Sequence, residues 1–177
     1  MKSKFIKAHL QVARVYGQLS TATRLKVGCI IVKDDRIISI GYNGMPSGAS
    51  NVCEENGKTK PEVFHAEANA ITKLAKSSES SEGAYMFVTH APCLDCAKLI
   101  LQSGIQELHY EISYKKDDGI NLLKANWKVH GWYGQRVFKH RDSFREFWSS
   151  RIPDGHVGAL VDPDDLMGMT RTPWGFF

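Results

Sequence analysis

Three side chains in the middle of the chain have the types and the spacing of zinc ligands. His65 is followed by Ala66 and Glu67, and the segment Pro92-Cys93-Leu94-Asp95-Cys96 supplies two thiols three residues apart. A structural zinc site is closed by four protein ligands, whereas a catalytic site has three and leaves one position for water. One histidine, two cysteines and a carboxylate that is not needed as a ligand therefore predict a hydrolytic zinc centre, with Glu67 as its acid–base group.

The alternative is a structural zinc with a fourth ligand from elsewhere in the chain. The candidates for that ligand are His9, Cys29, Cys53 and His90. None of them stands at a paired spacing, and a structural site would leave Glu67 without a purpose. We therefore favour the open site. We also expect one zinc per subunit, because Cys53 is the only Cys or His in residues 51–63 from which a second site could be built.

Two helix starts must bring the ligands together. Pro92 suits the first turn of a helix, where its missing N–H costs nothing, and Cys93 and Cys96 then share one face. The N-terminal end of that helix favours the thiolate form of both cysteines. His65 is expected to begin a second helix that runs to Lys76.

The rest of the chain alternates helical and strand patterns. We expect helices over 4–19, 65–76, 93–102 and 119–125, and strands over 27–32, 36–41, 84–89, 106–110 and 127–129. The first helix carries Phe5, Val12, Tyr16 and Leu19 at helical spacing, with Ile6, Leu10 and Ala13 beside them, and Lys33-Asp34-Asp35 joins the first two strands as a hairpin. Residues 43–63 form a long polar loop, a length that is usually functional. This order predicts an α/β fold, a three-layer α/β/α sandwich around a mixed five-stranded sheet.

Composition sets the broad class. The 177 residues are 42% hydrophobic and 24% charged, which is ordinary for a globular protein with a full core. The net charge of +4 suits an anionic ligand but does not demand nucleic acid. Four cysteines, two at metal-ligand spacing, favour a reducing compartment. With no apolar run near the roughly 20 residues that span a bilayer and no signal-peptide pattern, we expect a cytoplasmic protein without membrane contact.

The C-terminal part differs in composition from the rest. We expect a zinc-dependent domain over residues 1–130 and an extension over 131–177, with an amphipathic helix followed by an extended tail rich in Gly, Pro and Asp. Aromatic and basic residues interleave from Trp132 to Arg151, which is also typical of single-stranded nucleic-acid binding. Because the acidic tail would repel a polyanion, we favour packing on the domain or on a neighbouring subunit and expect no nucleic-acid partner.

The motif resembles a known family. The order H-x-E…P-C-x-x-C is the signature of zinc deaminases that act on nucleobases. The segment Gly41-Tyr42-Asn43-Gly44-Met45-Pro46-Ser47-Gly48 is similar to a loop of the deoxycytidylate (dCMP) deaminases, and the segments 27–32, 68–71 and 103–105 also fit. The resemblance covers roughly residues 5–126 and implies the cytidine-deaminase-like fold.

The resemblance implies an activity and roles for particular residues. The reaction would be hydrolysis of dCMP to dUMP and ammonia by a zinc-bound hydroxide held by His65, Cys93 and Cys96, with Glu67 carrying the protons. The backbone N–H of Ala66 would hold the base carbonyl, Asn43 would contact the deoxyribose, and Tyr114 would stack on the base or close the pocket. The alternatives are a deaminase of free cytidine or deoxycytidine, which the 41–48 loop argues against, and a deaminase of cytosine or adenosine in single-stranded nucleic acid.

Regulation and assembly are implied in the same way. Members of the family are activated by dCTP and inhibited by dTTP, and Mg²⁺ would accompany the triphosphate. The residues expected at that allosteric site are Arg24, Lys26, Gly41, Tyr42, Asn43 and Gly44, and Arg24 and Lys26 would serve the substrate phosphate as readily. An effector site between subunits needs an assembly, so we expect a homo-oligomer, a hexamer by family resemblance.

Overall fold

The elements follow the predicted order, with one small addition. The computed structural model describes residues 1–131 except 115 and 127, so the predicted extension over 131–177 lies almost entirely outside the described residues. The elements are α1 (Ser3–Gly17), β1 (Gly28–Lys33), β2 (Arg36–Tyr42), β3 (Glu54–Glu55), β4 (Lys58–Thr59), α2 (Ala66–Leu74), β5 (Tyr85–His90), α3 (Leu94–Gln102), β6 (Glu107–Ile112), α4 (Asp118–Asn126) and β7 (Lys128–Gly131). No helix among the described residues has the length and apolar character that crossing a membrane requires.

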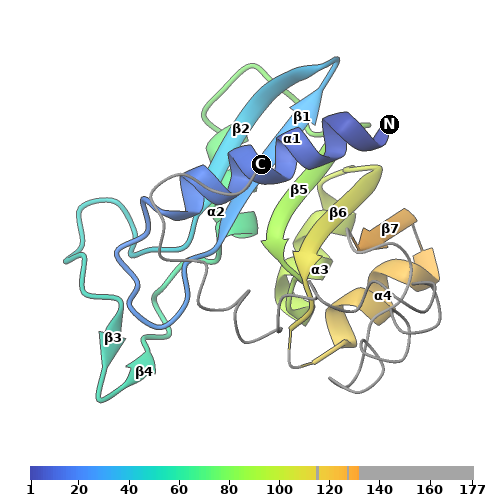
Figure 1. Ribbon diagram of the computed structural model, residues 1–177. Helices are drawn as coiled ribbons and strands as arrows, with labels where there is room; N and C mark the ends of the chain where they lie inside the picture. The colour runs from blue at the N-terminus through green and yellow to red at the C-terminus, as the bar shows by residue number, and fades with distance from the viewer. Residues whose placement is uncertain (115, 127, 132–177) are drawn as a thin grey trace, which may run out of the picture. The chain divides into compact units, whose positions relative to one another are not determined.

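The main sheet has five strands in the order β2-β1-β5-β6-β7 (Figure 1). Strand β1 is antiparallel to both of its neighbours, β2 and β5, whereas β5, β6 and β7 run parallel. This confirms the predicted mixed five-stranded sheet. The parallel crossovers carry α3 and α4, as parallel strands require.

Helices cover both faces of the sheet. Side chains alternate between the two faces along a strand, and in β1 Ile30 packs towards α1 while Cys29 and Ile31 pack towards α2 and α3. The same alternation in β5 sends Phe87 towards α1 and Met86 to the opposite face. Figure 1 shows α1 lying across one face of the strands, and this confirms the three-layer sandwich. Cys29 is fully buried in the sheet.

The hairpin between β1 and β2 turns through Asp34 and Asp35. Both residues have a positive φ, 49° and 58°. A two-residue turn with positive φ at both positions matches the twist of the flanking strands, which is why it joins them although aspartate is less suited to it than Asn-Gly. The predicted hairpin is confirmed.

Most of the apolar residues predicted for the first helix pack against the sheet, and the two at its ends do not. Phe5 and Leu19 are 47% and 57% exposed, whereas Leu10 and Ala13 are buried. Ile6, Val12 and Tyr16 pack, half-buried, against the same core. The helix lies close to the sheet at a glycine, because a Cβ on Gly28 would lie 1.8 Å from the carbonyl oxygen of Ala13. Leu19 also lies beyond the end of the helix.

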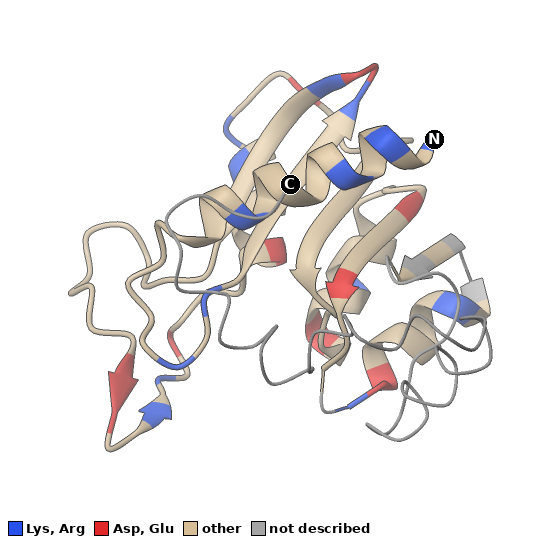
Figure 2. Ribbon diagram, viewed as in Figure 1, with Lys and Arg blue, Asp and Glu red and all other residues tan. Residues whose placement is uncertain are grey.

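The long loop contains a short hairpin that the sequence analysis missed. Strands β3 and β4 pair antiparallel around Asn56-Gly57, with φ of 51° and 72°. Asn-Gly is the strongest short signal for such a turn. Figure 2 shows the acidic β3 beside the basic β4. Beside this hairpin Cys53 is buried with Ala22 and Val63, so it acts as a small apolar residue.

Candidate active site

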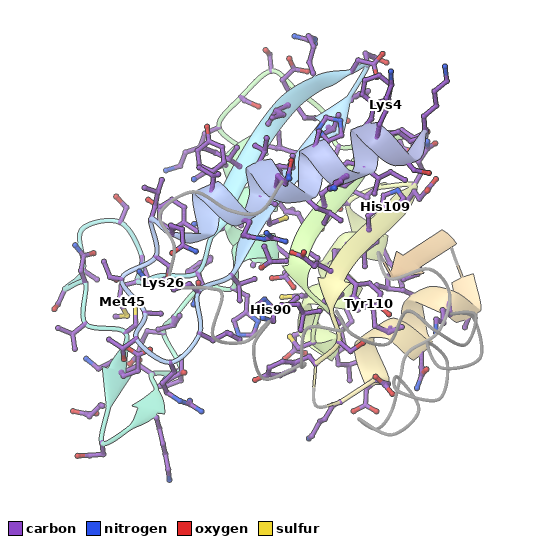
Figure 3. All side chains as sticks on the ribbon, viewed as in Figure 1. Lys4, Lys26, Met45, His90, His109 and Tyr110 are labelled. Carbon is purple, nitrogen blue, oxygen red and sulfur yellow. The ribbon has the colours of Figure 1, made fainter. Side chains whose placement is uncertain are left out.

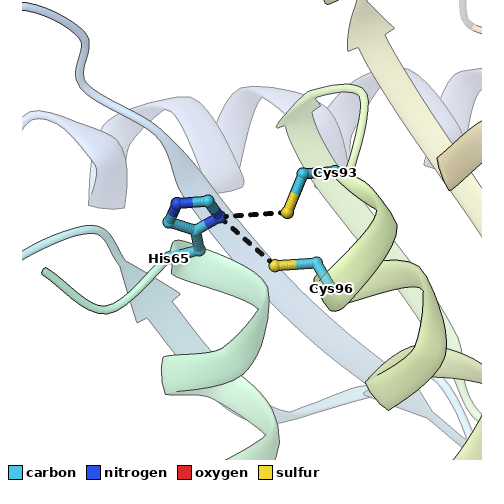
Figure 4. A group of neighbouring side chains, drawn as sticks. All are labelled: His65, Cys93 and Cys96. Atoms are coloured by element: carbon cyan, nitrogen blue, oxygen red, sulfur yellow. Dashed lines mark hydrogen bonds between the residues drawn. The ribbon is translucent and has the colours of Figure 1, made fainter. Parts of the chain in front are cut away.

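The three predicted ligands meet at the start of two helices. The Nδ1 atom of His65 lies 3.4 Å from the Sγ atoms of both Cys93 and Cys96, as Figure 4 shows. All three donor atoms lie within 4.8 Å of one another. The structure therefore brings together, from α2 and α3, the side chains that spacing alone had singled out.

His65 and Cys93 occupy equivalent positions on their helices. Each is the N-cap residue, with extended backbone angles and no side-chain capping hydrogen bond. Cys93 thus precedes α3, and Pro92 lies one residue further out, not in the first turn as predicted. Ala91 still follows the sheet, since its N–H donates to the carbonyl of Ile112 at 2.8 Å, and α3 begins only after Cys93. The backbone N–H groups of the first turn remain available to stabilise a thiolate.

The hydrogen bond between the two thiols shifts their pKa values in opposite directions. Hydrogen bonds from the Cys96 thiol and from His65 lower the pKa of Cys93 to about 3. The Cys93 thiolate and burial in turn raise the pKa of Cys96 well above its usual range. The hydrogen bond with Cys93 also raises the pKa of His65. A thiolate poised beside a second thiol and an imidazole nitrogen is a donor set that suits zinc.

The donor set is open. Among the described residues, the cluster of candidate donors contains His65, Cys93 and Cys96, and none of the four alternative ligands considered above belongs to it. Cys29 and Cys53 are buried in apolar clusters elsewhere. Three protein donors leave one position of a tetrahedral zinc for a reactant.

Glu67 lies beside this cluster in a nearly water-free position. It is the second residue of α2 and is 4% exposed. Burial raises its pKa, against the opposing effects of its own backbone N–H and of His65. A buried carboxyl group with a raised pKa beside a metal site is typical of a group that gains and loses protons during a reaction.

A cavity of about 310 Å³ connects two of the donors and Glu67 with four of the other predicted site residues. Its lining includes His65, Glu67 and Cys93, together with Arg24, Asn43, Ala66 and Tyr114. The volume is in the lower range of small-molecule sites. Lys26, Gly41, Tyr42 and Gly44 are not among the lining residues.

The side chain of Asn43 lines the cavity and also forms hydrogen bonds with the backbone before β1. Its Oδ1 accepts the N–H of Val27 at 2.8 Å, and its Nδ2 donates to the carbonyl of Leu25 at 2.8 Å. The side chain therefore fixes the entry into β1. One proton of Nδ2 remains for a ligand, and the contact with deoxyribose stays a prediction.

Arg24 and Lys26 were both predicted to bind a phosphate, but their side chains contact different parts of the structure. The Nη1 atom of Arg24 donates to Oγ1 of Thr59 at 2.9 Å, and the Glu54 carboxylate accepts the backbone N–H of Arg24 at 3.3 Å. Lys26 reaches the carbonyl of Gln18 at 3.4 Å. The β3–β4 hairpin thus holds Arg24 at the cavity, and the sequence analysis missed Glu54 and Thr59 because they act through this missed hairpin.

The remaining residues of the 41–44 segment make packing contacts. A Cβ on Gly41 would lie 2.1 Å from the carbonyl oxygen of Ala66, so only glycine allows α2 this close to β2. The ring of Tyr42 lies 5.4 Å from Nζ of Lys73, and Gly44 exchanges backbone hydrogen bonds with Phe64. A role of these residues in binding an effector stays a prediction.

Residues 2–112 match the family described as the cytidine and deoxycytidylate deaminase zinc-binding region. The chain belongs to this family. It is therefore a zinc-dependent deaminase, which is a hydrolase.

Individual relatives agree with this assignment. The deoxycytidylate deaminase of Enterobacteria phage T4 is 37% identical, over 67% of this chain and 93% of the phage protein. The human deoxycytidylate deaminase is 42% identical, over 56% of this chain and 60% of the human protein. A crystal structure of dCMP deaminase from the cyanophage S-TIM5 in complex with dCMP and dUMP is similar with a TM-score of 0.72, at 43% identity, over 74% of this chain and 98% of that one.

Proposed function

We propose that this deaminase hydrolyses dCMP to dUMP and ammonia. The proposal is carried by one observation: two of the three metal donors, His65 and Cys93, and the buried Glu67 share a cavity with Arg24, a cationic side chain suited to a phosphate. The similar cyanophage enzyme, whose structure holds dCMP and dUMP, supports the same substrate.

The metal donors, Glu67 and Ala66 have defined parts in the proposed reaction. When held by His65, Cys93 and Cys96, zinc supplies Lewis-acid activation of the attacking water at neutral pH. The bond from C4 of cytosine to the amine breaks and a bond from C4 to oxygen forms. Glu67 takes one proton from the water and gives it to N3 of the base. It then takes the second proton of this water from the oxygen now bound to C4 and gives it to the departing amino group, which leaves as ammonia. The backbone N–H of Ala66 holds the base carbonyl.

The nucleotide is recognised at the other end of the cavity. Arg24 is the only Lys or Arg among the described residues that line it. Its guanidinium has five N–H donors, of which one engages Thr59, so the others remain for a 5′-phosphate. Asn43 lies at the deoxyribose, and Tyr114 stacks on the base or closes the entrance.

The test is a spectrophotometric comparison of dCMP, dCTP and deoxycytidine as substrates of the zinc-loaded enzyme. We expect kcat/KM for dCMP to exceed that for deoxycytidine by at least tenfold, the effect of about 1.4 kcal/mol of phosphate contact. Preference for deoxycytidine would identify a nucleoside deaminase instead. Deamination of cytosine in a single-stranded oligonucleotide at a similar rate would contradict both.

We further propose regulation of this activity by nucleotides in a homohexamer. The dCTP activator, with Mg²⁺ on its phosphates, and the dTTP inhibitor would bind at Arg24, Lys26 and the 41–44 segment. Support comes from family resemblance and from the adjacency of this segment to the cavity through Asn43. Kinetics with added dCTP or dTTP, alongside sedimentation velocity, test it, and a rate that neither nucleotide changes would remove the regulatory proposal.

We place the enzyme in the cytoplasm. A reducing compartment would keep Cys93 and Cys96 available as metal ligands, because their sulfur atoms lie within 4.8 Å of each other and oxidation to a disulfide would destroy the site. Cell fractionation tests this, and recovery of the active enzyme from an oxidising compartment would contradict it.

A further inference from the structure

His90 is a polar residue of the cavity that the reaction described above does not use. It is the last residue of β5 and pairs with Ile112 of β6. The antiparallel register of β1 and β5, continued past Cys29 and Val88, places His90 next to Val27. His90 and Val27 both line the cavity, and Figure 3 labels His90 near the centre of the molecule, where the strands end.

A buried hydrogen-bond chain determines which ring nitrogen of His90 carries the proton. The backbone N–H of Gly28 donates to Oγ1 of Thr89 at 3.2 Å, and this same oxygen lies 3.0 Å from Nδ1 of His90. Thr89 is 4% exposed, so water does not readily accept a hydrogen bond from its hydroxyl group. If Nδ1 carried a proton, the hydroxyl proton would be left buried without an acceptor, which is costly. Thr89 therefore donates to Nδ1.

A neutral imidazole that accepts at Nδ1 carries its proton on Nε2. Burial lowers the pKa of His90, with Glu111 acting weakly in the opposite direction, so the neutral ring is favoured at neutral pH. In this hydrogen-bond chain from Gly28 through Thr89 to His90, the protein engages Nδ1 of His90. The N–H group at Nε2 therefore remains available to donate to a ligand. The ring becomes a hydrogen-bond donor of fixed orientation in the wall of the cavity.

We infer that His90 is a nucleotide-binding residue whose Nε2–H donates to an oxygen of the sugar–phosphate half of the substrate. This inference rests on the proposed function, which assigns the base to the zinc end of the cavity and its carbonyl to Ala66. The acceptors then left on the nucleotide are the oxygens of the deoxyribose and of the 5′-phosphate. Thr89 is a positioning residue that acts through His90.

The first test observes the tautomer directly. In long-range ¹H–¹⁵N spectra of the zinc-loaded enzyme, the His90 signals are identified by their loss in His90→Gln. We expect the Nε2-protonated pattern in the wild type and in Thr89→Ser, and its loss in Thr89→Val. A protonated Nδ1 in the wild type would overturn the inference, whatever the activity of the enzyme.

The second test measures binding of dUMP by calorimetry to three variants whose melting temperatures match the wild type. The amide nitrogen of Gln can take the place of Nε2, the shorter Asn reaches only the place of Nδ1, and Leu offers no donor. We expect about tenfold weaker binding for His90→Asn and His90→Leu, the effect of one lost hydrogen bond to an oxygen. We expect less than a threefold change for His90→Gln.

A comparison with deoxyuridine separates the two acceptors. If the His90 variants lose affinity for dUMP only, the contact is with the phosphate. If they lose affinity for deoxyuridine equally, the contact is with the sugar. Wild-type affinity in His90→Asn, or the same loss in all three variants, would overturn the inference. A wild-type enzyme that fails to deaminate dCMP would instead overturn the proposed function.

Discussion

The surroundings of Glu67 determine how its carboxyl group can exchange protons. On a surface its carboxyl group would be ionised and inert, but at 4% exposure beside three metal donors it sits where a proton can be held and passed on. The sequence located it because the helix that begins after His65 keeps the ligand and the carboxylate two residues apart.

Replacing Glu67 with Gln should keep the site and remove the proton carrier. The amide has the same shape, so we expect zinc content to remain at one ion per chain by elemental analysis. Turnover of dCMP should fall by about 10²–10⁴-fold, the usual contribution of acid–base catalysis. Activity near that of the wild type would mean that another group moves the proton.

Replacing Arg24 with Gln should weaken recognition of the phosphate. We expect KM for dCMP to rise by about tenfold or more, because a charge-assisted contact contributes about 1.5–3 kcal/mol. KM for deoxycytidine should change little. Arg36→Gln is the matched control, since Arg36 lies at the opposite end of β2 from Asn43 and pairs with Glu79 at 3.3 Å. Equal losses for both substrates would show a structural role for Arg24.

For individual residues, the sequence predicted the metal donors, whose positions depend on local spacing. It did not distinguish residues whose roles depend on contacts with distant parts of the chain. His65, Cys93 and Cys96 follow from helix starts that the sequence marks. Arg24 and Lys26 are two residues apart and equally basic, and only the contact of Arg24 with Thr59 on the 58–59 strand separates them.

At the scale of elements, two glycines set how closely the helices approach the sheet. Gly28 lies under α1, and Gly41 lies under α2. The periodicity of the sequence predicted the helices and strands well, because each runs for several residues with one buried face. It also predicted the packed face of α1, but not that Phe5 and Leu19 at the ends of this face are exposed.

Replacing Gly41 with Ala should destabilise the protein. The new Cβ would meet the backbone oxygen of Ala66 at 2.1 Å and the backbone nitrogen of Ala70 at 2.6 Å, and neither atom can move without shifting α2. We expect a loss of about 1–3 kcal/mol or more, read as a lower melting temperature. Gly44→Ala is the control, because nothing lies within 4 Å of its Cβ position. Similar melting temperatures for the two variants would show that the α2–β2 packing is looser than described.

In the molecule as a whole, the site is formed by side chains from several elements that are distant in the sequence. The cavity collects side chains from residues 24 to 114, and the metal donors join the starts of α2 and α3. Such a bridge ties the reaction to the stability of the fold, because an ion that binds only the folded state stabilises it. Sequence analysis placed the donors but not the cavity, whose walls come from segments with no common pattern.

Removing the metal with a chelator should therefore abolish activity and lower the melting temperature together. Zinc at about 1,000 times its dissociation constant contributes roughly 4 kcal/mol, or on the order of 10 °C for a chain of this size. Adding Zn²⁺ back should restore both, whereas adding Mg²⁺ should restore neither. A chelated protein that remains fully active would rule out a zinc mechanism.

The strand order has a consequence for biosynthesis. Strand β1 needs both β2 and β5 as neighbours, yet the 42 residues from 43 to 84 must be translated between them. At about 5–20 residues per second, the ribosome takes roughly 2–8 s over that stretch. Throughout that interval the nascent hairpin presents an open, apolar edge to other chains. Stalled translation anywhere in this window would release a fragment prone to aggregation.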